Sequence, residues 1–252
     1  MIDTILYERS GHIARILLNN PERHNALGQE ELAGMQAALD EVSADDQVRV
    51  LVLTGAGEKT FCAGASLQQL EAGHIRQDCF QETAEQLHKL AVPTICALNG
   101  SVFGAGVELA LSCDFRLGVE GSRMRVPAAA IGICYPLSGI SRLVEHLGVN
   151  LARRILVASE SFEAQAMLEI GFLDHLLLPS QLEEETHKMA RHISELAPLA
   201  VRSMKEILLQ AASGEIDANR IAALTSLCAN SSDLQEGLAA QREKRTPRFR
   251  GE

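Results

Sequence analysis

The sequence is poor in aromatic residues, with no Trp, only two Tyr and seven Phe among 252 residues. Its core must therefore be built mainly from Ala, Leu, Val and Ile, within a hydrophobic fraction of 46%. No stretch approaches the roughly 18 apolar residues of a membrane-spanning helix, and the N-terminus lacks the basic start and apolar run of a signal peptide. We expect a soluble α/β protein of the cytoplasm that does not enter a membrane.

Basic residues are also scarce, because 23 Lys and Arg stand against 33 Asp and Glu and give a formal net charge of −10. This balance argues against nucleic acid as a partner, since nonspecific binding requires a basic surface. The exception is the C-terminal segment QREKRTPRFRGE. It is either a solvated terminus or a contact to a phosphate or a neighbouring subunit, and its basic residues are Arg242, Lys244, Arg245, Arg248 and Arg250.

Metal-ligand and disulfide patterns are missing as well. The six Cys form no CxxC pair, and most lie in apolar surroundings, as expected for reduced core residues. The eight His are scattered without ligand spacing. The sequence therefore predicts no metal site.

The most informative stretch that is present is NGSVFGAGVELALSCD, residues 99–114. A strand at 94–98 leads through glycines into an apolar helix that carries one carboxylate, Glu108. Glycines at such a junction let a ligand approach the backbone, and they leave the first helical amides free to bind an anion. Glu108 could reach that ligand, and burial would raise its pKa toward the range useful for proton transfer. The alternative is a glutamate stabilised by the helix dipole and paired with an arginine.

The same order of strand, glycine-rich loop and helix occurs at residues 48–70, where Val48–Leu53 is followed by TGAGEKTFCAGASL. Ser66 is a suitable N-cap for the helix that follows. Right-handed crossovers would place both loops at one edge of a mostly parallel sheet, where such folds bind ligands. Elsewhere, the pattern predicts a hairpin at residues 2–18, a helix at 29–42 and a largely helical chain from residue 138 onward, including a helix at 162–170.

Four segments together, NNPERHNAL, TFCAGASL, NGSVFGAGVELALSCDFR and QREKRTPRFRG, resemble the crotonase (enoyl-CoA hydratase/isomerase) superfamily in order and separation. The resemblance implies a spiral of ββα repeats over residues 1–195 and a helical region over 196–252 that forms trimers or dimers of trimers. It also implies an acyl-CoA or enoyl-CoA thioester as substrate, with no further cofactor.

In this family two backbone amides hold the thioester oxygen as it becomes an enolate, and the resemblance assigns that role to Ala65 and Ala105. Such preorganised donors contribute several kcal/mol to the charged state. The matching substrate and CoA contacts are Arg23, Ala26, Leu27, Ala63, Gly64, Ser66, Leu67, Gly104 and Lys244, with Lys59 as a further basic candidate.

One position departs from the family's hydratases, which use a pair of glutamates. Glu108 matches the first, and the position of the second is Ala128, whose methyl group transfers no proton. We favour a hydratase in which Glu108 works alone or with a substitute such as Tyr135. An isomerase with one base, a decarboxylase or hydrolase, and a non-catalytic acyl-CoA-binding protein remain open.

Three further positions lie near these motifs. Ser66 stands where the family usually has an aspartate, so a charge near the ligand is lost while helix capping is kept. Asp114 and Arg116 are predicted to pair with each other, and Arg142 is predicted to be structural.

Overall fold

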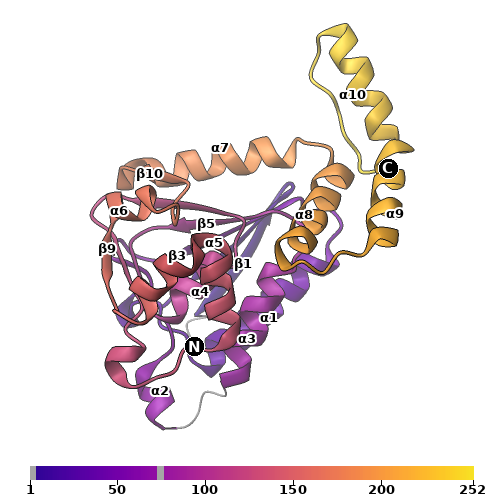
Figure 1. Ribbon diagram of the computed structural model, residues 1–252. Coiled ribbons are helices and arrows are strands. Elements are labelled where there is room, and N and C mark those ends of the chain that lie inside the picture. Colours follow the sequence, from indigo (N-terminus) through magenta and orange to yellow (C-terminus); the bar gives the residue numbers. More distant parts are fainter. Residues whose placement is uncertain (1–3, 73–76) are drawn as a thin grey trace.

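The computed structural model describes residues 4–72 and 77–252, and its centre is a six-stranded sheet (Figure 1). The strand order is β1-β2-β3-β5-β7-β10. Only β1 and β2 pair antiparallel, as the predicted hairpin, and the other neighbours are parallel. The strands are β1 (Ile5–Ser10), β2 (Ile13–Leu18), β3 (Val50–Gly55), β5 (Thr94–Leu98), β7 (Phe115–Val119) and β10 (His175–Leu177).

A second sheet has four short strands in the order β4-β6-β8-β9, and in the sequence its strands alternate with those of the main sheet. Its members are β4 (Thr60–Cys62), β6 (Ser101–Phe103), β8 (Arg123–Arg125) and β9 (Ser161–Glu163). After β3, β5 and β7 the chain adds one short strand to this sheet and then forms a helix. These helices are α2 (Leu67–Glu71), α4 (Ala105–Leu111) and α5 (Leu137–Leu156). This succession confirms the predicted spiral of ββα units.

Strand β3 is buried on both faces and divides two apolar cores. Val50 and Val52 pack toward α7 (Leu182–Ser194), whereas Leu51 and Leu53 belong to the larger core on the opposite face. Successive side chains of a strand point to opposite faces, so VLVL serves both cores at once. The larger core includes α1 (Gln29–Ala44), whose predicted apolar face is buried in full: Leu32, Met35, Ala38, Leu39 and Val42. Figure 1 shows α7 on one face of the sheet and α1, α3 (Gln77–His88) and α4 on the other.

Two local predictions were wrong. Residues 161–163 form strand β9, with Phe162 opposite Met124, and only Ala164–Glu169 forms the helix α6. Asp114 and Arg116 also do not pair with each other. Asp114 accepts a 2.6 Å hydrogen bond from Lys205, and Arg116 lies 3.7 Å from Asp174. Both partners come from distant segments that the fold brings to this strand.

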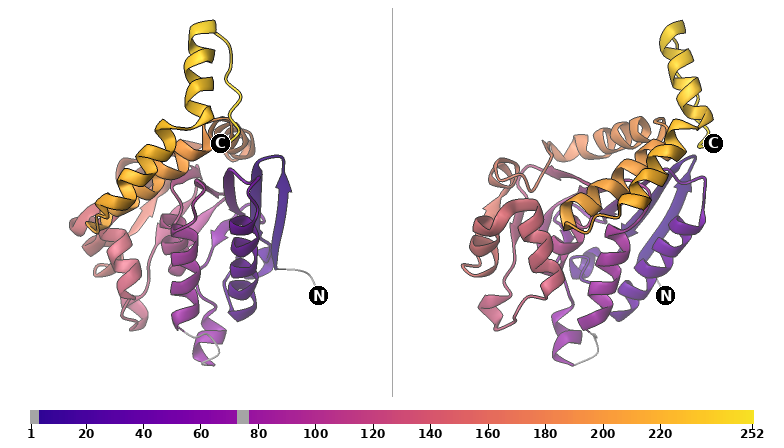
Figure 2. Two further views of the ribbon diagram at one scale, coloured as in Figure 1. Left: turned by 90° about the vertical axis from the view of Figure 1, so that its right-hand side faces the viewer. Right: turned by 45° about the vertical axis from the view of Figure 1, so that its right-hand side comes forward.

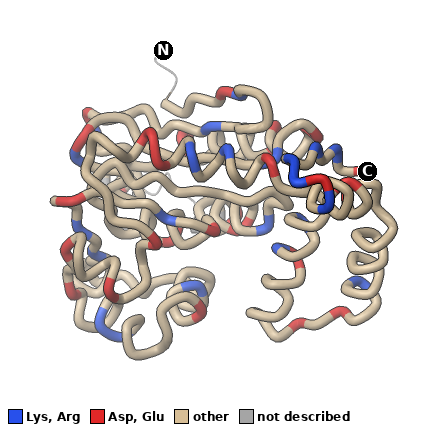
Figure 3. The backbone as a smooth tube through the Cα atoms, turned by 90° about the horizontal axis from the view of Figure 1, so that it is seen from above, with Lys and Arg blue, Asp and Glu red and all other residues tan. Residues whose placement is uncertain are grey.

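The C-terminal helices leave the body of the molecule. Lys205 of α8 (Pro198–Ser213) fastens that helix to the core, because its ammonium group bonds both Asp114 and the carbonyl of Val92. The next two helices, α9 (Ala218–Ala229) and α10 (Ser232–Glu243), project away from the sheets, as Figures 1 and 2 show. Acidic and basic residues are interspersed along the chain (Figure 3). Within the described residues, no helix has the length and apolar character needed to cross a membrane.

The remaining elements are short or lie beside these layers. They are α3 (Gln77–His88) and the 3-10 turns η1 (Pro21–Arg23), η2 (Ala129–Ile131) and η3 (Pro179–Gln181).

Candidate active site

The two glycine-rich loops meet at one edge of the main sheet, because β3 and β5 are parallel neighbours and each loop follows its carboxyl end. Asn99 ties the loops together. Its side-chain oxygen accepts the N–H of Gly55 at 3.0 Å, and its amide nitrogen donates to the carbonyl of Gly57 at 2.7 Å. The sequence-based expectation that both loops share one edge is therefore confirmed.

Glycines allow the two loops to touch. Gly64 has φ +86°, and a Cβ placed on it would lie 2.8 Å from the backbone nitrogen of Ala105. A Cβ on Gly106 would lie 2.9 Å from the Cβ of Cys62. Real side chains do not fit at such distances, so both positions require the smallest residue.

The N–H groups of Ala65 and Ala105 are both available to a ligand. The N–H of Leu27 donates to the carbonyl of Gly64, and the carbonyl of Leu27 accepts the N–H of Ser66. In this parallel bridge the N–H of Ala65 points away from Leu27. Ala105 is the first residue of α4, where an N–H has no partner within the helix. In residues 4–72 and 77–252, neither N–H donates a hydrogen bond to a protein acceptor.

Glu108 lies one turn into α4 and is almost completely enclosed, with 1% of its surface exposed. Its Oε1 accepts a hydrogen bond from the Ser138 hydroxyl at 3.0 Å, whereas Oε2 has no partner among the described residues. Burial raises the pKa of Glu108, and the Ser138 hydrogen bond and the charge of Arg142 partly oppose this rise. A carboxyl group in this state suits proton transfer.

Arg142 is a buried neighbour of Glu108, with 4.0 Å between its Nη1 and Oε1. The guanidinium also donates to Ser112 at 3.0 Å and to Glu85 at 3.0 Å. Arg142 thus links α3, the end of α4 and α5, as expected for a residue with a structural role. It also places a positive charge beside the Glu108 carboxyl group.

Two hydroxyl groups from the segment before and at the start of α5 reach the site. Tyr135, considered above as a substitute acid, donates to the carbonyl of Gly104 at 3.2 Å. Ser138 was missed, because nothing in PLSGI marks a serine that contacts a carboxylate 30 positions earlier. A polar residue within the first turn of an otherwise apolar helix start was the only available signal.

Ala128 is buried, with 8% of its surface exposed, and it precedes η2 as part of the larger core. Its side chain is a methyl group and carries no polar atom. Ser66 directly precedes α2, and its hydroxyl accepts the N–H of Gln69 at 3.4 Å, as expected for a cap. Leu67 is the first residue of that helix.

The polar loop of residues 19–27 lies against the glycine-rich loop that follows β3. The N–H of Ala63 donates to the carbonyl of His24 at 3.0 Å, and that of Leu27 donates to the carbonyl of Gly64 at 2.8 Å. Ala26 is half-buried beside them, and Arg23 and Lys59 are exposed. The fold therefore places the backbone of Ala26 and Leu27 beside that of Ala63 and Gly64, four of the positions predicted to contact CoA.

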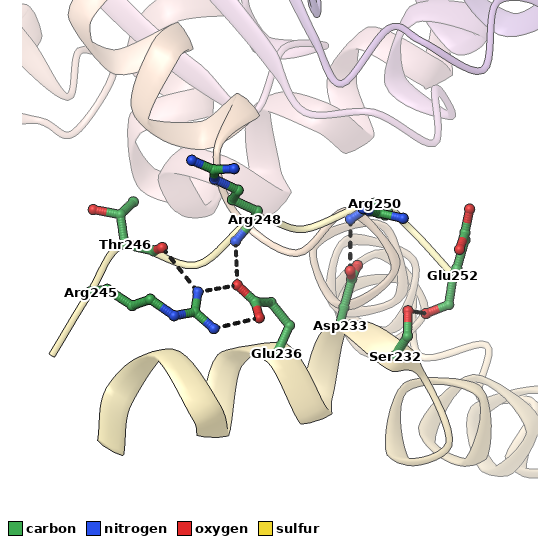
Figure 4. Close-up of a pocket in the computed structure, with 8 residues that line it drawn as sticks. All are labelled: Ser232, Asp233, Glu236, Arg245, Thr246, Arg248, Arg250 and Glu252. Atoms are coloured by element: carbon green, nitrogen blue, oxygen red, sulfur yellow. Dashed lines mark hydrogen bonds and ion pairs between the residues drawn. The ribbon is translucent and has the colours of Figure 1, made fainter. Parts of the chain in front are cut away.

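Lys244 is the exception, since it caps the C-terminal end of α10. Helix α10 and the tail that follows it, residues 232–252, form a C-terminal hairpin that projects away from these loops within one chain. In the cleft of that hairpin the tail returns along α10 (Figure 4). Glu236 accepts two hydrogen bonds from Arg245, and Asp233 accepts the N–H of Arg250 at 2.7 Å. Among the described residues, no three His, Cys, Asp or Glu side chains gather in a way that would hold a metal ion.

Within the described residues, two loops that follow parallel strands present unpaired backbone amides, and a buried carboxyl group lies one helical turn beyond the second amide. These are the parts of an α/β enzyme site that can stabilise a developing oxyanion. The chain matches the family model described as enoyl-CoA hydratase/isomerase over residues 8–252. It is 31% identical to the crotonyl-CoA hydratase of Syntrophomonas wolfei over 254 residues, covering 98% of each chain. The protein belongs to the enoyl-CoA hydratase/isomerase family, the crotonase superfamily.

Solved structures agree with this assignment. The enoyl-CoA hydratase of Bacillus anthracis superposes with a TM-score of 0.88 at 30% identity, covering 99% of this chain and 100% of that one. An enoyl-CoA hydratase/carnithine racemase of Magnetospirillum magneticum gives 0.93 at 27% identity, with 100% and 97% coverage. The crotonase fold predicted from the motifs is thus confirmed.

Proposed function

We propose that the protein is a hydratase that adds water to the double bond of a 2-enoyl-CoA thioester. The Ala65 and Ala105 N–H groups hold the thioester oxygen, and Glu108 exchanges protons with water and with the α carbon. The observation that carries this proposal is that one site holds two backbone N–H groups and a buried carboxyl oxygen, Oε2 of Glu108, none of which has a hydrogen-bond partner in the described part of the chain.

The chemistry needs few groups. Glu108 accepts a proton from water as the oxygen bonds to the β carbon, and the negative charge moves to the thioester oxygen between the two amides. Glu108 then returns a proton to the α carbon. Proton transfer and amide donation suffice for both steps, so the proposal requires no metal or redox cofactor.

A double-bond isomerase is the second candidate, and the observation that favours it is Ala128. With no carboxylate at that position, one base must carry out all proton transfers, and isomerisation needs only one base to move a proton between two carbons. A hydratase deprived of one acid/base group is expected to be slower by about 10²- to 10⁴-fold than one with both.

Incubation with a short 2-enoyl-CoA and, separately, a 3-enoyl-CoA separates the candidates. A hydratase removes the absorbance of the conjugated thioester from the first, whereas an isomerase creates it from the second. The Ala128→Glu variant sharpens the test, because a gain in hydration rate would show that the rest of the site is competent. A protein that binds CoA thioesters in calorimetry yet converts neither substrate would contradict both candidates and favour a binding protein.

We also propose that the chain assembles into trimers or dimers of trimers through its C-terminal helices. Large apolar side chains are left exposed there: Met204, Leu208, Leu227, Leu234 and Leu238. Exposed large apolar side chains that gather in one region are typical of protein interfaces. In such an assembly Lys244 and the other basic residues of the tail would reach the CoA phosphates of a neighbouring copy. Sedimentation of wild type against Leu208→Asp tests the proposal, and a wild-type monomer would contradict it.

A further inference from the structure

The four residues from Tyr135 to Ser138 contact both halves of the proposed site. At one end of this segment the Tyr135 hydroxyl donates to the carbonyl of Gly104. At the other end the Ser138 hydroxyl donates to Oε1 of Glu108. One short segment therefore bonds the amide-bearing loop and the carboxyl group at once.

The Tyr135 hydrogen bond acts on the peptide group that carries the Ala105 N–H. The carbonyl of Gly104 and the N–H of Ala105 belong to a single planar unit, so holding the oxygen also fixes the direction of the N–H. Gly104 has φ +52° and ψ −125°, a conformation that only glycine adopts without steric strain. The same carbonyl accepts the N–H of Val107 at 3.1 Å. Two donors on one carbonyl polarise the peptide and strengthen its N–H as a donor.

The Ser138 hydrogen bond acts on the carboxyl group. It occupies Oε1 and leaves Oε2 without a partner among the described residues. Gly139 packs against that free oxygen, because a Cβ there would lie 2.6 Å from Oε2 and 2.3 Å from Cε1 of Tyr135. The carboxyl group is thus held in one orientation between Ser138 and Gly139.

We propose that Tyr135 and Ser138 are positioning residues of this site, the first aiming the Ala105 N–H and the second fixing Glu108 so that Oε2 is the oxygen that exchanges protons. The inference rests on the proposed function. The two hydroxyl groups supply polar contacts that hold Gly104 and Glu108 in place. Burial, and next the charge of Glu108, raise the pKa of Tyr135 well above its ordinary value, so the phenol stays a donor at neutral pH.

The Ser138→Ala variant tests the carboxyl arm. A hydrogen bond to a carboxylate favours its charged form, so its removal must raise the pKa of Glu108. The acidic limb of the pH–rate profile and the carbon-13 titration of the Glu108 carboxyl should both move to higher pH, and Ser138→Thr should restore them. Ser122→Ala, which removes another buried hydroxyl, is the control. An unchanged titration in Ser138→Ala would overturn this arm.

The Tyr135→Phe variant tests the amide arm. We expect kcat to fall about tenfold, less than the 10² or more that follows the loss of a whole oxyanion donor, with KM within about twofold. The nitrogen-15 and proton shifts of the Ala105 amide should also change. Tyr7→Phe is the matched control, because Tyr7 is the other tyrosine of the chain and lies on β1. An Ala105 amide unaffected by Tyr135→Phe would overturn this arm.

The two spectroscopic measurements do not depend on turnover. If wild-type protein converts no enoyl-CoA, the proposed function fails, while the Glu108 titration and the Ala105 resonance still decide whether these residues position the groups. If wild type is active and neither measurement moves, the positioning inference alone fails.

Discussion

The loop edge of the sheet leaves polar groups without hydrogen-bond partners in the described part of the chain, whereas the C-terminal hairpin leaves apolar side chains exposed. At the loop edge, the N–H groups of Ala65 and Ala105 and one oxygen of Glu108 have no hydrogen bond within the described residues. In the hairpin the polar groups are well paired, since Asp233 accepts the N–H groups of Arg250 and Gly251. Leu234 and Leu238 of α10 nevertheless remain 42% and 48% exposed.

This difference indicates what each region is built to bind. An unpaired polar group in a closed setting is costly, so its persistence points to a small polar ligand that completes it. An exposed apolar face with its polar groups already satisfied points to a protein surface. This contrast supports the proposals that the first region is the chemical site and the second an assembly surface.

Replacing the free carboxyl group should have the largest effect. Glu108→Gln keeps the shape and the Ser138 contact but accepts no proton, so kcat on an enoyl-CoA should fall by about 10²- to 10⁴-fold. Glu183→Gln, on the surface of α7, is the control and should keep wild-type turnover. Equal rates for the two variants would remove Glu108 from the mechanism.

Closing the gap between the loops should have the next largest effect. Gly64→Ala introduces a Cβ 2.8 Å from the Ala105 nitrogen at a residue with φ +86°. We expect kcat to fall about 10²-fold through the displaced amide, with a loss of about 1–3 kcal/mol of folding stability. Gly121→Ala, at φ +78° with open space around it, separates backbone strain from the clash. Parallel losses of kcat in both variants would contradict a specific clash.

A polar change in the hairpin should act on stability and assembly and leave the site chemistry intact. Asp233 is 3% exposed and holds the returning tail by two backbone N–H groups. Asp233→Asn places donors against donors and should cost about 1–3 kcal/mol of hairpin stability. Hydrogen exchange of the Arg250 and Gly251 amides measures this directly. Unchanged protection would show that the tail is held by other contacts.

The smallest effect concerns pH and stability. The folded-state pKa of Glu108 is raised, so its contribution to stability is fully present below the unfolded pKa and is lost as pH rises through the folded pKa. Relative to Glu108→Gln, wild type should therefore become less stable between mildly acidic and neutral pH. Denaturant midpoints across that range measure the difference, and a pH-independent difference would show that Glu108 is not destabilised by burial.

Much of the loop edge was predictable because its signals are local. Glycines beside a strand end, a lone carboxylate in an apolar helix and the alternation of β3 all lie within short stretches of sequence. The partners of charged residues were not predictable in this way. Asp114 and Arg116 are neighbours in sequence, yet each bonds to a residue that the fold supplies from α8 or from the turn before β10.

The sequence by itself determined the fold family, the two glycine-rich loops and the candidate acid, because periodicity and glycine spacing act over a few residues. Only the tertiary structure decided that the N–H groups of Ala65 and Ala105 are both unpaired within residues 4–72 and 77–252, and that Tyr135 and Ser138 reach the site. Those contacts join elements 30 or more positions apart, and their direction depends on how α5 packs against α4. Hydrogen bonds are short and directional, so no pattern along the chain reports them before the helices are in place.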